Sequence, residues 1–175
     1  MSWFYEIRSF FSEKNPNLRG RRILGTWQIE VGKSTQNGTY LTEMWHDLLF
    51  HRLPKETKAK RILILGLGSG STIRLYRKRF PNASITAVEW DPVMVHLMDT
   101  LEHFSPTMRP EVFVGDAREI IATLQGSFDL ITSDLFEGPK VSSATISRDY
   151  LSHLHRLLRP SGYLLVNVYS EPELL

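Results

Sequence analysis

The stretch Arg61-Ile-Leu-Ile-Leu-Gly-Leu-Gly-Ser-Gly70 decides the fold of this 175-residue chain. Residues 62–65 form a continuous apolar run, as a strand buried on both faces of a parallel sheet requires. Glycines follow at alternate positions, Gly66, Gly68 and Gly70, where the missing Cβ permits a tight turn and close approach of a ligand. The apolar spacing that follows predicts a helix whose first N–H groups are free. The stretch therefore predicts a strand, a glycine loop and a helix that hold a nucleotide-like ligand.

A second predicted strand, Ser84–Glu89, ends in an acid. Nucleotide-binding α/β folds place an acid about 20 residues beyond the glycines, where it accepts hydrogen bonds from ribose hydroxyls. Ser71 occupies the last glycine position of the dinucleotide fingerprint. That departure favours S-adenosylmethionine over NAD and disfavours an NAD-dependent oxidoreductase. On the motif alone, a purely structural glycine turn stays an alternative.

Composition sets bounds on the function. A net charge of +2 is too small to indicate a nucleic-acid partner, and the absence of cysteine excludes disulfides and thiolate metal sites. No apolar run reaches the ~20 residues of a membrane span, and the first residues do not resemble a signal peptide. His96, Asp99 and His103 share a helix face but lack a fourth ligand, so we expect no metal site. A cytoplasmic location is expected.

The rest of the chain alternates strands with helices. Strands are predicted at 111–116, 128–134 and 162–168, and helices at 71–80, from Asp91-Pro92 onward, at 117–124 and at 147–158, with a loop over 135–145. This order predicts an α/β fold with a doubly wound parallel sheet. Glu89, Asp116 and Asp134 then fall at the carboxyl ends of strands, where such sheets bind ligands.

The first 57 residues follow a different pattern. The aromatic spacing of residues 1–20 predicts an amphipathic helix, with a strand as the alternative. Residues 21–31 alternate as one half-buried strand, and Asn37-Gly38 suits a hairpin turn. A further helix is predicted from Thr42 to Leu53. We expect residues 1–57 to form a small lid-like element of helix and β-hairpin, and residues 58–175 to form the Rossmann-like domain that binds S-adenosylmethionine.

These features resemble the class I S-adenosylmethionine-dependent methyltransferase fold, and within it the spermidine synthase-like family, from Tyr40 to Val168. The motifs are Leu63-Ile-Leu-Gly-Leu-Gly-Ser-Gly70, Val88-Glu-Trp-Asp-Pro92, Val114-Gly-Asp-Ala117 and Gly162-Tyr-Leu-Leu-Val-Asn167. The resemblance implies the strand order 3-2-1-4-5, with Glu89 on the ribose and Asp116 on the adenine amino group. The cofactor-binding residues that it implies are Gly66, Gly68, Ser69, Gly70, Glu89, Trp90, Asp116, Ala117 and Asp134.

The resemblance also implies catalytic residues. Asp134-Leu-Phe-Glu-Gly138 falls where spermidine synthases carry an Asp-x-x-Asp-Pro signature, and Tyr40 lies in the segment that borders the amine pocket. Glu137 stands in place of the second aspartate, and Ser69 in place of an acid in the glycine loop. Asp134 would then accept a proton from the attacking amine, while Glu137 would anchor a distant ammonium. The alternative is that Asp134 only contacts the cofactor and Glu137 is a solvated loop residue.

The function that follows is a spermidine synthase-like transferase. It would move a methyl group from S-adenosylmethionine, or an aminopropyl group from decarboxylated S-adenosylmethionine, to a small-molecule acceptor, an amine such as a polyamine. The alternative is a non-catalytic module that binds S-adenosylmethionine or serves in assembly.

One expectation concerns the last predicted strand. Class I folds normally add two strands after the fifth, and this chain ends at Leu175. Residues 163–168 are therefore expected to form an apolar sheet edge. Because such an edge offers unpaired N–H and C=O groups, we expect it either to pair with a second copy, giving a homodimer, or to be covered by the N-terminal aromatic segment.

Overall fold

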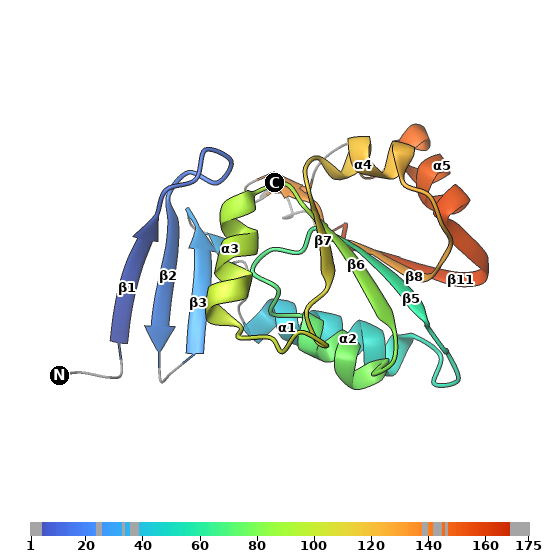
Figure 1. Ribbon diagram of the computed structural model, residues 1–175, viewed down its shortest axis with the longest axis horizontal. Coiled ribbons are helices and arrows are strands. Elements are labelled where there is room, and N and C mark those ends of the chain that lie inside the picture. The colour runs from blue at the N-terminus through green and yellow to red at the C-terminus, as the bar shows by residue number, and fades with distance from the viewer. Residues whose placement is uncertain are drawn as a thin grey trace, which may run out of the picture.

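The computed structural model describes residues 5–23, 26–32, 34–35, 39–137, 140–141, 145 and 147–168. Its centre is a five-stranded sheet of order β11-β8-β5-β6-β7, in which every pairing is parallel (Figure 1). This is the predicted 3-2-1-4-5 order read from the other edge, so the α/β class and the doubly wound topology are confirmed. The strands are β5 (Arg61–Leu65), β6 (Ser84–Glu89), β7 (Glu111–Val114), β8 (Phe128–Ser133) and β11 (Leu158–Val166).

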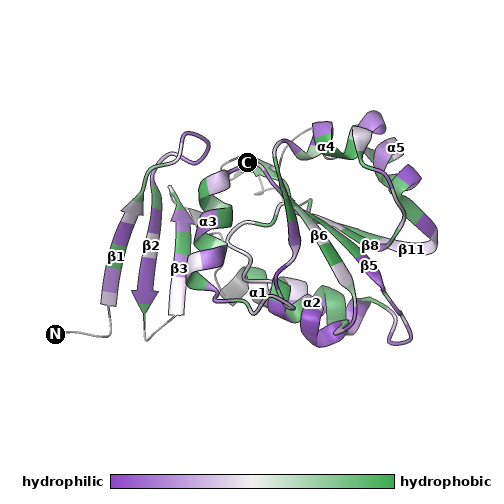
Figure 2. Cartoon of the chain, viewed as in Figure 1, coloured by the Kyte–Doolittle hydropathy of each residue, from purple (hydrophilic) through white to green (hydrophobic). Residues whose placement is uncertain are grey.

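Helices cover both faces of this sheet. Apolar side chains of α2 (Ile73–Arg79), α3 (Pro92–Leu101) and the π-helix η1 (Leu48–Arg52) pack on one face, beside α1 (Thr39–Asp47). On the other face pack α4 (Ala117–Thr123) and α5 (Arg148–Leu157). The apolar run of β5 lies between the two layers, with residues 62–65 at most 3% exposed. Figure 2 shows α2 and α5 as mixtures of hydrophobic and hydrophilic residues, as helices with one buried face should be.

A second, antiparallel sheet of order β1-β2-β3-β4 precedes this domain. Its strands are β1 (Tyr5–Phe10), β2 (Leu18–Ile23), β3 (Thr26–Val31) and β4 (Ser34–Thr35). It packs on α3, which lies between the two sheets (Figure 1). The buried residues of this contact are Leu18, Ile29, Val31, Met94 and Leu97.

The predictions for the N-terminal part need correction. Residues 5–10 form a strand and not the helix expected over 1–20, because their backbone pairs with β2 from Tyr5↔Ile23 to Phe10↔Leu18. The single strand expected over 21–31 is two strands, since the chain reverses direction between Ile23 and Thr26. The next strand pairing, of β3 with β4, includes Val31↔Ser34 and so lies before the turn predicted at Asn37-Gly38. The turn predicted at Asn37-Gly38 lies outside the described residues.

Smaller corrections concern element ends. The helix predicted from Thr42 begins at Thr39 and continues as η1 to Arg52. The loop predicted over 135–145 contains a short antiparallel pair, β9 (Phe136–Glu137) with β10 (Lys140–Val141). The last strand begins at Leu158, four residues before the predicted Gly162, because Leu158 already pairs with Phe128.

The described part of the N-terminal segment, from Tyr5 onward, does not cover the edge formed by β11. β1 pairs with β2, and the N-terminal sheet lies beyond α3, at the end of the molecule opposite β11 (Figure 1). Within the described part of the chain, β11 pairs with β8 alone. The predicted homodimer stays a prediction. None of the described helices is long and apolar enough to cross a membrane.

Candidate functional site at the carboxyl ends of the strands

The glycine loop after β5 is packed tightly. Gly66, Gly68 and Gly70 all have positive φ, at 86°, 57° and 78°. A Cβ on Gly66 would lie 2.2 Å from the backbone oxygen of Asp134, and one on Gly70 would lie 2.5 Å from Cγ of Met98. The loop therefore requires glycine for its contacts with the end of β8 and with α3, as well as for its backbone conformation.

Glu89 connects this loop to the end of β6. Its side chain is 5% exposed. Its carboxylate accepts hydrogen bonds from the backbone N–H of Gly68 at 2.7 Å and of Asp91 at 3.1 Å. Burial raises the pKa of Glu89 above its ordinary value, although these hydrogen bonds act in the opposite direction. The predicted ribose acid thus fixes the position of the glycine loop.

Asp134, directly after β8, is held by two side chains that are distant in sequence. The indole Nε1–H of Trp45 in α1 donates to Oδ2 at 3.0 Å, and Nδ2 of Asn167 donates to Oδ1 at 2.9 Å. Burial raises the pKa of Asp134, and the two hydrogen bonds offset this in part. Each oxygen keeps lone-pair capacity for a further donor. The sequence reasoning missed Trp45, and its nearest signal was the adjacent segment around Tyr40.

Asp116 follows β7 and begins α4. It accepts a hydrogen bond from the backbone N–H of Arg118 at 2.8 Å, and Nε of the same arginine lies 3.0 Å from each carboxylate oxygen. The side-chain hydrogen bond from Arg118 is the main reason that the pKa of Asp116 is lowered, and burial opposes it. Ala117, the first residue of α4, is buried. Asp116 is therefore ionised and already paired.

Two further predicted residues lie at the same end of the sheet. Trp90 follows β6 and is 37% exposed, which leaves part of its ring available for contact. Ser69 is 2% exposed, and its Oγ has no hydrogen-bond partner among the described residues. A buried hydroxyl without a partner costs free energy unless something else satisfies it. This orphaned group in the glycine loop fits a loop that receives a polar ligand.

Two predicted catalytic residues are described by their backbones alone. Tyr40 lies in α1 and Glu137 in β9, and their side chains lie outside the description. The structure therefore brings Glu89, Asp116 and Asp134 to one end of the sheet and leaves the Tyr40 and Glu137 assignments as predictions.

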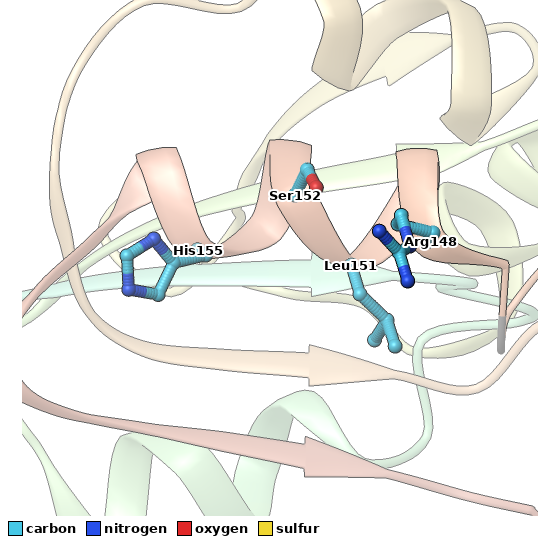
Figure 3. Close-up of a pocket in the computed structure, with 4 residues that line it drawn as sticks. All are labelled: Arg148, Leu151, Ser152 and His155. Atoms are coloured by element: carbon cyan, nitrogen blue, oxygen red, sulfur yellow. The ribbon is translucent and has the colours of Figure 1, made fainter.

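No metal site is found among the described residues, where no three His, Asp or Glu side chains gather around one point. Asp99 instead pairs with Arg109, at 2.7 Å between Oδ1 and Nε. A shallow hollow lies along the outer face of α5 (Figure 3). Its lining residues, Arg148, Leu151, Ser152 and His155, include none of the predicted site residues.

Comparison with known proteins identifies the family of this chain. A family model described as a methyltransferase domain matches residues 62–162. A polyamine aminopropyltransferase of Vibrio vulnificus is 35% identical over 67% of this chain and 40% of its own length. The eEF1A lysine and N-terminal methyltransferase of Homo sapiens is 29% identical over 61% of this chain and 17% of its own length. The chain thus spans less than half the length of these curated relatives.

Solved structures support the same fold. A probable spermidine synthase from Corynebacterium glutamicum superposes with a TM-score of 0.68 at 19% identity, covering 91% of this chain and 62% of that one. Human methyltransferase-like protein 13, in complex with SAH, gives a TM-score of 0.55 at 24% identity, covering 73% of this chain and 63% of that one. Similarity at this level establishes the fold, which is the spermidine synthase-like, class I architecture.

Proposed function

Because this chain belongs to the methyltransferase domain family, we propose that it is a transferase dependent on S-adenosylmethionine or its decarboxylated form. It transfers a methyl or aminopropyl group to an amine acceptor, such as a polyamine. One observation carries the proposal: Asp134, a carboxylate whose pKa is raised, lies at the carboxyl end of a central strand beside the glycine loop. A carboxyl group whose pKa is raised by burial, at the ligand-binding end of a parallel sheet, is a candidate functional group.

The residues present fit the cofactor. The glycine loop offers its backbone and the unpartnered Ser69 hydroxyl. Glu89 would accept hydrogen bonds from the ribose, Trp90 would contact the adenine, and Asp116 would accept from the adenine amino group. When bound, the cofactor supplies a carbon attached to a sulfonium, so the protein mainly has to align the acceptor and keep it neutral.

Asp134 suits the second task. An alkyl amine has a pKa near 10 and is mostly protonated at neutral pH. The raised pKa makes Asp134 a better proton acceptor than an ordinary carboxylate, and Trp45 and Asn167 hold its two oxygens in place. In the same proposal Glu137 anchors a distant ammonium, and Tyr40 borders the amine pocket.

The wider assignments are part of this proposal. Residues 1–57 act as a lid-like element on the domain formed by residues 58–175. The partner is a small molecule and not nucleic acid or a membrane, and the location is cytoplasmic. The comparisons include both aminopropyltransferases and methyltransferases, so they support either transferred group.

The test compares wild type with Asp134→Asn in binding and turnover. Calorimetry with S-adenosylmethionine, its decarboxylated form and 5′-methylthioadenosine identifies the ligand. Turnover is then measured with a diamine and with a monoamine acceptor. Asp134→Asn should lower turnover by about 10²–10⁴-fold, with only a modest loss of cofactor affinity, because a general base is lost.

Other outcomes would change the assignment. If affinity and turnover fall together in Asp134→Asn, the residue is a cofactor contact and not the base. A wild-type protein that binds S-adenosylmethionine but alkylates no amine would be the non-catalytic module, which the departures at Glu137 and Gly138 from the family signature favour. A wild-type protein that binds none of the three compounds would overturn the proposal.

A further inference from the structure

The loop between β1 and β2, residues 11–17, is fixed at the carboxyl end of the five-stranded sheet. Ser12 is 8% exposed, and its hydroxyl donates to Oδ2 of Asp91 at 2.5 Å. Nδ2 of Asn15 donates to the same oxygen at 2.5 Å. Asp91 is 1% exposed and caps α3 through the N–H of Val93 at 2.8 Å. Since Asp91 comes two residues after Glu89, these contacts hold the loop next to the predicted ribose acid.

The loop also has internal hydrogen bonds that define its conformation. The hydroxyl of Ser12 accepts from the backbone N–H groups of Lys14 at 3.1 Å and Asn15 at 3.0 Å. Asn17 has a φ of 61°, and its carbonyl accepts from the N–H of Gly32 at 3.3 Å. The side chain of Lys14 therefore starts from a backbone whose position is fixed by both ends of the loop.

Lys14 lies over the residues expected to hold the nucleoside. Its Nζ is 5.7 Å from the centroid of the Trp90 ring, within the range of a cation–π contact. Its charge is also one of the causes, after Arg118, that lower the pKa of Asp116. Lys14 is thus near the ends of both β6 and β7. Figure 1 shows the β1–β2 loop at the same end of the molecule as the start of α3.

We propose that Lys14 is a ligand-binding residue and that the β1–β2 loop forms the outer wall of the nucleoside pocket. This inference rests on the proposed function, because it takes an adenine nucleoside as the ligand. An ammonium only donates hydrogen bonds, and both the ring nitrogens of adenine and the ribose oxygens accept them. A base lying against Trp90 would have such atoms within reach of Lys14. The N-terminal sheet would then contribute to the site directly, through one side chain.

Calorimetry with S-adenosylmethionine and 5′-methylthioadenosine tests this inference. The proteins are wild type, Lys14→Met, Lys14→Arg and, as a control, Lys58→Met, which removes an exposed lysine from the segment before β5. Lys14→Met should weaken both ligands by about tenfold, because both contain the adenine nucleoside. Lys14→Arg should recover most of the affinity, and Lys58→Met should bind as wild type does. Thermal melting of each variant without ligand checks the fold.

Measuring both ligands distinguishes failure of this inference from failure of the proposed function. If wild type binds both compounds and Lys14→Met binds each of them with the wild-type affinity, the inference is wrong and the proposed function stands. If Lys14→Met loses affinity for S-adenosylmethionine alone, Lys14 acts on the amino-acid part and the nucleoside wall is wrong. If wild type binds neither compound, this inference is wrong. The proposed function is overturned with it only if wild type also fails to bind decarboxylated S-adenosylmethionine.

Discussion

The five-stranded sheet carries carboxyl groups at its two ends whose pKa values are shifted in opposite directions. At the amino end, Asp129 accepts hydrogen bonds at 2.8 Å from the backbone N–H of Lys60, the backbone N–H of Arg61 and Nη1 of Arg159. Burial alone would raise its pKa, but these donors outweigh burial and the pKa is lowered. At the carboxyl end, burial dominates and raises the pKa of Glu89 and Asp134.

The difference separates stability from function. A carboxylate whose pKa is lowered on folding stabilises the folded chain at neutral pH, and one whose pKa is raised destabilises it. Asp129 therefore stabilises the amino end of the sheet. Glu89 and Asp134 cost folding free energy where they lie, which is typical of groups placed for binding or catalysis.

The largest expected effect comes from replacing Gly66, at the carboxyl end, with alanine. The added Cβ would lie 2.2 Å from the backbone oxygen of Asp134, and backbone atoms cannot move away cheaply. We expect a loss of about 3 kcal/mol or more in the free energy of unfolding. The matched variant is Gly126→Ala at the amino end, where φ is also positive and the nearest atom is the tip of the Arg61 side chain at 2.6 Å.

Gly126→Ala should lower the free energy of unfolding less than Gly66→Ala does. The tip of the arginine side chain can move away from the new Cβ, so that only the backbone strain remains. Urea unfolding of both variants gives the comparison. Equal losses in the free energy of unfolding would mean that the positive φ alone determines the loss. The glycine loop would then pack less closely against the end of β8 than the structure shows.

A smaller effect should appear in the pH dependence of stability. Asp129, with its lowered pKa, contributes stability above the unfolded value of about 4, and this is lost as the pH falls through the folded pKa. Asp129→Asn should therefore cost about 1 kcal/mol at pH 7 and less as the solution is acidified. Asp134, with its raised pKa, destabilises once the pH rises above the unfolded value and through the folded pKa. The free energy of unfolding of Asp134→Asn, measured relative to wild type, should therefore increase as the pH rises through the folded pKa of Asp134.

Urea unfolding at a series of pH values from 3 to 7 measures both trends. When the free energy of unfolding of each variant relative to wild type is plotted against pH, the prediction requires slopes of opposite sign for Asp129→Asn and Asp134→Asn. If the two slopes have the same sign, the contrast between the ends of the sheet is not electrostatic.

How far the sequence predicts each region depends on how local the signal is. The carboxyl end was predictable because continuous apolar runs mark buried strands, and the residue after each strand must lie at that end. Residues 5–10 were harder, since Tyr5 and Ile7 are both 53% exposed and no buried face marks the strand. Their strand depends on pairing with β2, which local periodicity cannot show.

The contacts that complete the site were beyond sequence reasoning. Trp45 and Asp134 are 89 residues apart, and Ser12 and Asp91 are 79 apart. Neither contact follows from a motif, because each depends on how α1 or the N-terminal sheet packs against the central sheet. The sequence thus predicts which acids lie at the carboxyl end of the sheet, and tertiary packing determines which groups hold them.

The smallest expected effect is at the amino end, for Arg159→Gln. Arg159 is 42% exposed and Asp129 17% exposed, so water screens much of the attraction between them. Asp129 also keeps both backbone donors, Lys60 and Arg61, when the guanidinium is removed. The loss in the free energy of unfolding should stay below about 1 kcal/mol and shrink further in high salt. Urea unfolding at low and high ionic strength measures it. A loss well above that, unchanged by salt, would show that this ion pair, and not the backbone N–H groups, stabilises the carboxylate at the amino end of the sheet.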